Sequence, residues 1–224
     1  MTGLRERKKQ RTRDALLRAA NELFVSRGYE ETTVDEIAAA VDVSQRTFFR
    51  YFSGKDEAAF AIQMMVEERY IEALRARPAH EAPVVALRQA VEDGWNGISE
   101  AIERIVPIEL HMRMWHQIET TPVLTASHMR RSLEMEQRLA QIIADREGLD
   151  PRTDPRPRVL VAAFSAVIHV AMHQWAQGEE VTLESARQDA RRCLDELNPE
   201  LFAEWGGTRA AAEPRRICRS RRRR

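Results

Sequence analysis

Every strongly periodic stretch of this 224-residue sequence has the helical repeat, and no stretch shows the strict alternation typical of a β-strand. Prolines at Pro78, Pro83, Pro107, Pro122 and within 151–157 divide the pattern, because proline removes a backbone donor and clashes with the preceding turn. The sequence therefore predicts an all-α fold.

The helical pattern divides the chain into about nine helices. Four are expected up to residue 77 and five beyond it, at 5–27, from Thr33, 45–51, 55–77, 84–105, 107–118, 122–147, 157–177 and 183–197. We expect residues 1–56 to form a three-helix N-terminal domain and residues 57–205 a helical bundle. Residues 206–224 form an Arg-rich tail that is expected to be disordered.

Composition limits the class of protein. Hydrophobic residues make up 43% of the chain and charged residues 31%, as in a soluble globular protein. No apolar run follows the basic start, so no signal peptide is expected, and two cysteines are too few for a disulfide framework. These features favour a reducing compartment such as the cytoplasm.

The formal net charge is zero, but the charge is unevenly distributed. Residues 1–56 carry 11 Lys/Arg against 9 Asp/Glu, residues 213–224 carry 7 against 1, and residues 57–212 carry 17 against 25. Basic ends on an acidic body indicate that the ends meet a polyanion.

One segment has the length of a membrane span. Residues 159–177 contain no formally charged side chain, but they include Ser165, His169, His173 and Gln174, and much of their apolar content is alanine. A helix buried on several sides, or shared between two subunits, explains this segment better than a transmembrane helix.

Two short helices joined by a tight turn form the most informative pattern. Thr33 and Glu36 have the capping-box spacing, and residues 42–44 make a three-residue connection before the next helix. In a helix-turn-helix the second helix enters the major groove with its N-terminal residues. Gln45, Arg46 and Thr47 hold that position, and Gln pairs with adenine as Arg pairs with guanine.

The residues from Thr32 to Ser44, followed by Thr47–Phe52 and Lys55, resemble the DNA-binding domain of the TetR family of bacterial regulators. Leu23-Phe24 and Gly28-Tyr29 fit the same pattern. The resemblance covers about the first 60 residues. Beyond them the chain resembles the family only in being helical and of suitable length.

The resemblance implies that residues 1–56 are a helix-turn-helix DNA-binding domain and residues 57–205 an effector-binding and dimerisation domain. It implies a homodimer that binds a palindromic operator and represses until a small molecule enters the C-terminal domain. It implies base reading by Gln45, Arg46 and Thr47, and backbone contacts by Thr33, Ser44, Phe49, Tyr51 and Lys55. Two positions depart from the family pattern. Asp42 stands where Gly is common, although Asp also tolerates the left-handed region. Phe49 stands where Tyr is common, which removes a phosphate-binding hydroxyl.

The basic segments at the two ends leave two interpretations open. Residues 5–13 carry six Lys/Arg and one Glu, and they form either a solvated helix face or an arm that touches the minor groove or backbone. Residues 215–224 add sequence-independent affinity for DNA or are a solvated end.

In the rear domain the resemblance implies that Trp95, Met112, Trp115 and Phe164 are candidates for the effector pocket, because they lie on segments that surround the cavity in that family; plain core is the alternative. The pair His169 and His173 could ligate a metal, but nothing nearby in sequence completes a site, so neither a metal nor a cofactor is expected. We expect the segments 157–177 and 183–197 to form the dimer interface.

The sequence thus predicts a homodimeric repressor that binds double-stranded DNA and responds to an unidentified small-molecule effector. The alternative is a helix-turn-helix protein without such an effector, controlled by a protein partner or acting as an activator. No phosphate loop, nucleophile elbow or complete metal motif supports an enzyme. Arg46→Ala is expected to relax specificity at one operator position, and Lys55→Ala to weaken binding to all sequences.

Overall fold

The computed structural model describes residues 2–197, and within this range it contains ten helices and no strand. The predicted all-α fold is confirmed. The helices are α1 (Thr2–Arg27), α2 (Val34–Ala40), α3 (Gln45–Phe49), α4 (Lys55–Ala76), α5 (Pro83–Trp95), α6 (Ile98–Glu103), α7 (Ile108–Thr120), α8 (Pro122–Glu147), α9 (Arg156–Ala176) and α10 (Leu183–Asp195). The predicted tail at 206–224 lies outside the described residues.

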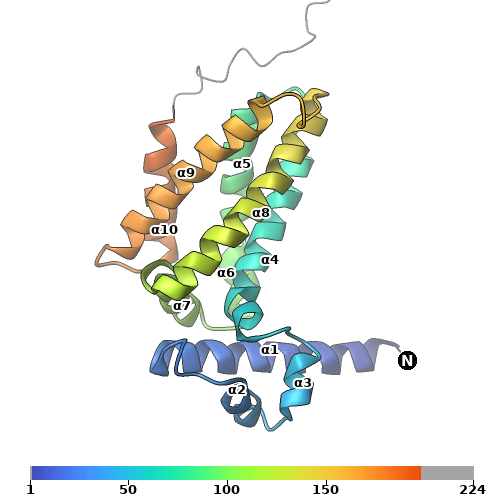
Figure 1. Cartoon of the computed structure of the whole chain (residues 1–224), viewed down its shortest axis with the longest axis vertical. Helices are drawn as coiled ribbons and strands as arrows, with labels where there is room; N and C mark the ends of the chain where they lie inside the picture. The colour runs from blue at the N-terminus through green and yellow to red at the C-terminus, as the bar shows by residue number, and fades with distance from the viewer. Residues whose placement is uncertain (1, 198–224) are drawn as a thin grey trace, which may run out of the picture.

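The helices form two parts that meet along α1. Helix α1 lies across the base of the molecule, with the short helices α2 and α3 beneath it (Figure 1). We call α1–α3 the reading head. Above α1, the helices α4, α5, α8, α9 and α10 form a bundle, and α7 crosses below them against α1.

One apolar core joins the two parts. Leu16 and Phe24 of α1, both fully buried, belong to the same cluster as Phe48 of α3, Trp115 of α7 and Trp175 of α9. Helix α4 begins at Lys55, so it starts in the reading head and continues into the bundle. The reading head is therefore packed against the bundle and is not connected to it by a linker.

The expectation of a single helix over 84–105 was wrong, and this is why the structure has ten helices where about nine were predicted. The first helix ends at Trp95. Asn96 follows in an extended conformation, and Gly97 has φ 71°. Glycine adopts this left-handed conformation without the Cβ clash that other residues suffer. The helical period on both sides of Gly97 concealed the break.

Helix α9 is long and apolar enough to cross a membrane by the measures of length and composition, the one such helix in residues 2–197. In the fold it lies between α8 and α10, and eight of its residues are buried there, among them Phe164 and Trp175. Packing in the bundle accounts for part of its apolar composition, while Val159 and Val170 are exposed.

Candidate nucleic-acid interface and ligand cavity

The start of α2 is fixed by a reciprocal cap. The backbone N–H of Glu36 donates to Oγ1 of Thr33 (3.2 Å), and the backbone N–H of Thr33 donates to Oε2 of Glu36 (2.9 Å). These hydrogen bonds from Thr33, together with the nearby Arg27 guanidinium, hold the pKa of the Glu36 carboxyl below its usual value. The capping box predicted from the spacing is confirmed, and the Thr33 hydroxyl is engaged in it.

The turn between α2 and α3 uses the left-handed conformation. Asp42 has φ 54°, which among the described non-glycine residues is the one positive value. The next residue, Val43, donates its N–H back to the Ala38 carbonyl (3.0 Å). Asp42 thus adopts the conformation for which Gly is common in this family, as its short polar side chain allows.

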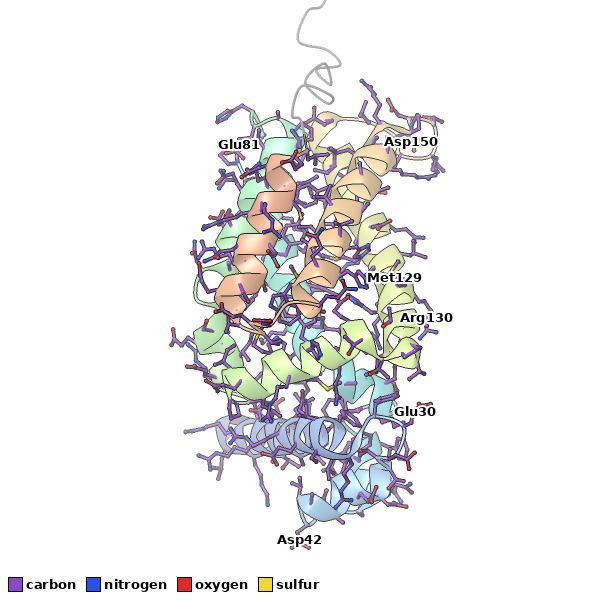
Figure 2. All side chains as sticks on the ribbon, turned by 90° about the vertical axis from the view of Figure 1, so that its left-hand side faces the viewer. Glu30, Asp42, Glu81, Met129, Arg130 and Asp150 are labelled. Atoms are coloured by element: carbon purple, nitrogen blue, oxygen red, sulfur yellow. The ribbon has the colours of Figure 1, made fainter. Side chains whose placement is uncertain are left out.

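Helix α3 presents a polar end to solvent. Ser44 caps it, accepting from the Thr47 N–H (3.2 Å), while Gln45 and Arg46 are exposed and Thr47 is half-buried. The turn before α3, marked by Asp42, lies at the lower extremity of the molecule (Figure 2). The structure therefore places the three predicted base-reading residues together on a protruding helix end, the part of a recognition helix that contacts base edges.

Phe48 and Phe49 have different environments although they are adjacent. Phe48 is fully buried and packs against Phe52 with ring centroids 5.4 Å apart, whereas Phe49 is 50% exposed. Phe49 lies on the same short helix as the base-reading residues, and its outward ring offers an apolar contact in place of a hydroxyl. Its predicted backbone contact stays a prediction.

The structure gives Lys55 a contact that the sequence did not predict. Its Nζ donates to three backbone carbonyls between α1 and α2, those of Tyr29 (2.9 Å), Glu30 (3.2 Å) and Thr32 (3.2 Å). It also lies 4.4 Å from the centroid of the Tyr29 ring. An ammonium group has three N–H donors, and all three are used here. Lys55 thus ties the first turn of α4 to the connection that leads into α2.

Arg50 is a candidate for DNA contact that the sequence analysis missed. Its guanidinium lies 5.1 Å from the ring centroid of Tyr51, and Nη2 donates to the Tyr51 hydroxyl (3.5 Å). Arg50 is exposed and Tyr51 is half-buried. An arginine inside an aromatic run directly after the recognition helix was the available indication, since Arg binds phosphate in a planar, bidentate way.

The basic N-terminal segment is helical. Helix α1 begins at Thr2, and its first turns project beyond α2 and α3 in Figure 1. The side chains of Arg5, Arg7, Lys8, Lys9 and Arg11 are exposed. These five cations stand on a helix and not on a flexible arm. Their contact with DNA stays a prediction.

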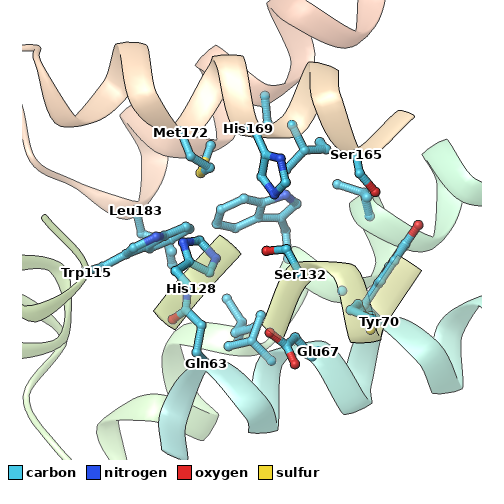
Figure 3. Close-up of a pocket in the computed structure, with 18 of the residues that line it drawn as sticks. Gln63, Glu67, Tyr70, Trp115, His128, Ser132, Ser165, His169, Met172 and Leu183 are labelled. Carbon is cyan, nitrogen blue, oxygen red and sulfur yellow. The ribbon is translucent and has the colours of Figure 1, made fainter. Parts of the chain in front are cut away.

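A cavity of about 210 Å³ lies inside the bundle. Three of the four predicted pocket residues, Trp95, Trp115 and Phe164, line it; the fourth, Met112, does not line it and is buried in the core cluster shared with α1. Further lining residues that sequence reasoning missed are Gln63, Glu67, Tyr70, His128, Ser132 and His169 (Figure 3). They come from α4, α8 and α9, and only the packing of these helices brings them together.

Histidines line the cavity in different environments. His128 pairs with Glu119 through Nδ1 and Oε1 (3.1 Å), and its ring centroid lies 6.2 Å from that of His169. Burial lowers the pKa of His169, and it lowers the pKa of His111 to about 4. His173 is exposed and bonds to Gln177 (2.9 Å), so the sequence pair His169/His173 does not converge. Within residues 2–197 no three potential ligands cluster around a metal position.

The outward faces of the last three helices differ in polarity. Large apolar side chains are exposed on α8 and α9, at Met129 (46% exposed), Leu133 (57%), Val159 (57%) and Val170 (52%), although α8 also exposes charged residues such as Arg130 and Glu134. The exposed residues of α10 are polar or charged, namely Glu184, Gln188, Arg191, Arg192 and Asp195. Helices α8 and α9 lie side by side (Figure 1), so their exposed apolar residues belong to neighbouring helices, whereas α10 offers a hydrophilic surface.

Two family matches cover most of the chain. Residues 16–62 match the family described as bacterial regulatory proteins, tetR family, and residues 81–199 match the MftR C-terminal domain. The HTH-type transcriptional regulator TcmR of Streptomyces glaucescens is 46% identical over 203 residues, covering 91% of this chain and 90% of the relative.

Solved structures share the fold. SmeT, the repressor of the Stenotrophomonas maltophilia multidrug efflux pump SmeDEF, has a TM-score of 0.54 at 20% identity, covering 90% of this chain and 96% of its own. The SmeT–triclosan complex has a TM-score of 0.53 at 20% identity, covering 83% and 88%.

Proposed function

Because the chain belongs to the TetR family of bacterial transcriptional regulators, we propose that it is a repressor that binds a palindromic operator as a homodimer and is released by a small molecule entering the bundle cavity. That it is a DNA-binding transcriptional regulator follows from the family. The operator geometry, the dimer and the effector are the proposal. The observation that carries it is that α4 contacts the reading head through Lys55 and lines the cavity through Gln63, Glu67 and Tyr70.

Operator reading rests on the protruding end of α3. Gln45 and Arg46 are exposed there, and Arg46 has no ion pair among the described residues that would occupy its guanidinium. Arg50 and Tyr51 follow directly and are placed for phosphate contact. Base contacts supply specificity and phosphate contacts supply position, and this surface offers both within seven residues of sequence.

The homodimer is supported by the apolar outward face of α8 and α9. A monomer gains nothing from exposing Leu133 and Val159, while a second copy would bury them against the same residues about a two-fold axis. The sequence analysis paired α9 with α10 in the interface. In our proposal α8 replaces α10 as the partner of α9, because α8 exposes the large apolar side chains of Met129 and Leu133 and α10 exposes none of that kind.

Effector release is supported by the path of α4. Its residues Gln63, Glu67 and Tyr70 line the cavity, and its first residue, Lys55, holds the carbonyls ahead of α2. The distance along the helix from Lys55 to Tyr70 is about 22 Å at 1.5 Å per residue. A ligand that moves α4 at the cavity therefore moves the connection that positions the two short helices.

A second contact joins the cavity to the start of α4. Arg131 of α8 pairs with Asp56 (2.9 Å) and lies 4.9 Å from the ring centroid of Phe60. Its neighbours on α8, His128 and Ser132, line the cavity. Movement of α8 is thus transmitted to the first turn of α4 through a side-chain pair. SmeT, which has this fold, has been solved with triclosan bound.

The alternative is a regulator without a small-molecule effector, controlled by a protein partner or acting as an activator. It would leave the cavity without a role. We assign no catalysis to the chain and place it in the cytoplasm with the DNA that it regulates.

The first test measures binding of the purified chain to the DNA upstream of its own coding sequence and to random duplex, at two salt concentrations. Tight binding to a short palindrome supports the dimeric regulator. Weak binding to both duplexes that high salt removes would overturn operator reading by α3. Arg46→Ala, which leaves the fold intact because its side chain is exposed, is the matched control.

The second test asks for a small-molecule effector. Metabolite mixtures are screened for compounds that both raise the melting temperature and release the operator duplex. Stabilisation by a ligand grows with its concentration. If no fraction does either, while the operator is still bound tightly, the partner-controlled alternative replaces the effector proposal.

A further inference from the structure

Helix α3 exposes one large apolar ring beside its polar end. Phe49 is 50% exposed, and within the described part of the reading head the other exposed large apolar side chain is Leu4, in the first turn of α1. Gln45 and Arg46, which we propose to read bases, are exposed as well. Since half of the Phe49 ring packs on nothing in the chain, that half is available for contact with DNA.

Phe49 lies on the same face of α3 as the base-reading residues. It follows Arg46 by three positions and Gln45 by four, and residues at these spacings are neighbours on a helix surface. The rise along the helix from Gln45 to Phe49 is about 6 Å at 1.5 Å per residue. A helix that brings Gln45 and Arg46 to base edges in the major groove therefore brings the Phe49 ring to the groove with them.

The Phe49 ring is held in one orientation by packing against the core. It meets the Phe48 ring at 89°, with ring centroids 5.6 Å apart, which is the edge-to-face arrangement that aromatic pairs favour. Phe48 is fully buried and packs in turn against Phe52, at 5.4 Å. Because a buried ring supports Phe49 from inside, little side-chain freedom is lost when its outer half contacts DNA.

The chemistry of the ring limits what it can contact. Phenylalanine has no group that hydrogen-bonds to a phosphate, so the hydroxyl contact of a tyrosine at this position is not available to it. The apolar group that the major groove presents is the C5-methyl group of thymine. Gln45 is suited to adenine, and an A·T pair that offers adenine to Gln45 offers the thymine methyl group in the same groove.

We propose that Phe49 is a specificity-determining residue that reads thymine, with the exposed part of its ring packed on the C5-methyl group of one thymine in each half-site of the operator. The inference rests on the proposed function, because it adds one residue and one base to operator reading by α3. For Phe49 it replaces the contact with the DNA backbone that the family resemblance implies.

The test removes the methyl group from the DNA. Uracil pairs with adenine as thymine does but lacks the C5-methyl group, so the exchange deletes the proposed contact alone. The probe is the palindrome bound in the DNA upstream of the chain's own coding sequence, with each thymine of the half-site replaced in turn. At one position or more, uracil should weaken binding about 4-fold in one half-site and about 15-fold in both, the ratios that one and two buried methyl groups supply. Fluorescence anisotropy at one fixed salt concentration measures the affinities.

The variant Phe49→Ala shows whether the ring makes this contact. At the sensitive position, uracil in one half-site should change the affinity of this variant by less than about 2-fold, because the methyl group has lost its partner. Comparing two operators with the same protein cancels any general loss of affinity in the variant. Arg50→Ala is the matched control at the next residue: it should weaken binding to both operators alike and keep the full cost of uracil. An equal cost of uracil in the unchanged chain and in Phe49→Ala overturns the proposal.

The sugar–phosphate backbone is the competing partner of the ring. Phe49→Tyr keeps the ring and adds a hydroxyl group, so a ring that packs on the methyl group keeps the cost of uracil in this variant. A ring that lies against the backbone gives a different pattern. Uracil then costs nothing at any position, while Phe49→Ala weakens binding to the operator and to random duplex by the same factor, and the proposal is wrong.

Failure of this inference and failure of the proposed function are separate results. If the palindrome is bound tightly but no uracil replacement weakens binding, or if its half-site contains no thymine, the chain reads its operator without this contact and the inference alone is overturned. If the chain prefers no duplex over random DNA, operator reading by α3 is wrong and the inference is wrong with it.

Discussion

The reading head and the bundle differ in how they satisfy buried polar atoms. In residues 3–56, every buried side-chain nitrogen or oxygen has a partner, as when Asn21 donates to the Leu17 carbonyl (2.8 Å) and Thr32 to that of Gly28 (2.8 Å). The buried atoms without partners all belong to residues 69–187, among them those of Tyr70, Trp115 and Gln117. Each such atom costs about 1–3 kcal/mol.

The difference suits the two tasks. A surface that reads base edges must hold its side chains in one geometry, and the caps at Thr33 and Ser44 do this locally. In the bundle the unpartnered atoms are spread over α4, α7, α8 and α10, and among their residues only Tyr70 and Trp115 line the cavity.

The largest effect is expected where the reading head is most tightly packed. Phe48→Ala removes a fully buried ring that contacts Phe52, and it should cost about 3–5 kcal/mol of unfolding free energy. Operator binding should be lost with it. Denaturant unfolding checks the stability. Phe49→Ala, at a half-exposed ring on the same helix, is the control and should change stability by less than about 1 kcal/mol; equal losses would contradict the packing described here.

Lys55→Met tests whether Lys55 acts on the protein or on DNA. Removing three hydrogen bonds to carbonyls should destabilise the free chain by about 2–3 kcal/mol. A lysine that only contacted phosphate would leave the free chain unchanged and reduce the salt dependence of binding by about one ion. Thermal unfolding without DNA separates the two. Lys8→Met, at an exposed lysine of α1, is the matched control for charge.

Arg46→Ala should act on recognition alone. We expect a loss of about 1–3 kcal/mol at one operator position, with specificity relaxed there and stability unchanged. The affinities of both proteins for a set of operators, each with one base pair changed, measure this loss. A similar loss on random duplex would show that Arg46 contacts phosphate and does not read a base.

The bundle should respond to acid through Glu92. Arg191 and Arg187 hydrogen-bond this carboxylate and lower its pKa to about 2, from an ordinary value of 4.5. Since the folded pKa lies below the unfolded one, the pair stabilises the chain fully above pH 4.5, and the stabilisation is lost as the pH falls from 4.5 towards 2.

The variant Glu92→Gln measures this contribution. It should cost about 1–2 kcal/mol at pH 7, after allowing for solvent screening, and almost nothing at pH 2. Unfolding of both proteins across this pH range is the measurement. If the difference in unfolding free energy between the two proteins grew towards low pH, the assigned effect of Glu92 on stability would be wrong.

Local features of the fold could be predicted from the sequence, because neighbouring residues determine them. Thr33 with Glu36, and the polar end of α3, depend on spacings of three residues or fewer. The interruption at Gly97 could not be predicted, since a helix tolerates an internal glycine at modest cost. The residues on both sides have the helical period whether the helix continues or ends there, and only the surrounding packing determines which occurs.

The cavity was predicted only in part for a similar reason. Trp95, Trp115 and Phe164 were predicted because they lie on segments that surround the effector cavity in the resembled family. Tyr70 and His128 stand 58 positions apart and both line the cavity only through the packing of α4 against α8. The partners of Lys55 likewise depend on the path of the chain between α1 and α2. No local pattern encodes either arrangement.

The turn at Asp42 has a consequence for how the protein searches DNA. Its carboxylate stands at the lower extremity of the reading head, beside the residues that we propose to read bases, where glycine would satisfy the backbone without adding charge (Figure 2). A negative charge there would repel phosphates whatever the base sequence, while base contacts would be made on the operator alone. We therefore expect Asp42 to lower the affinity for random DNA more than the preference for the operator.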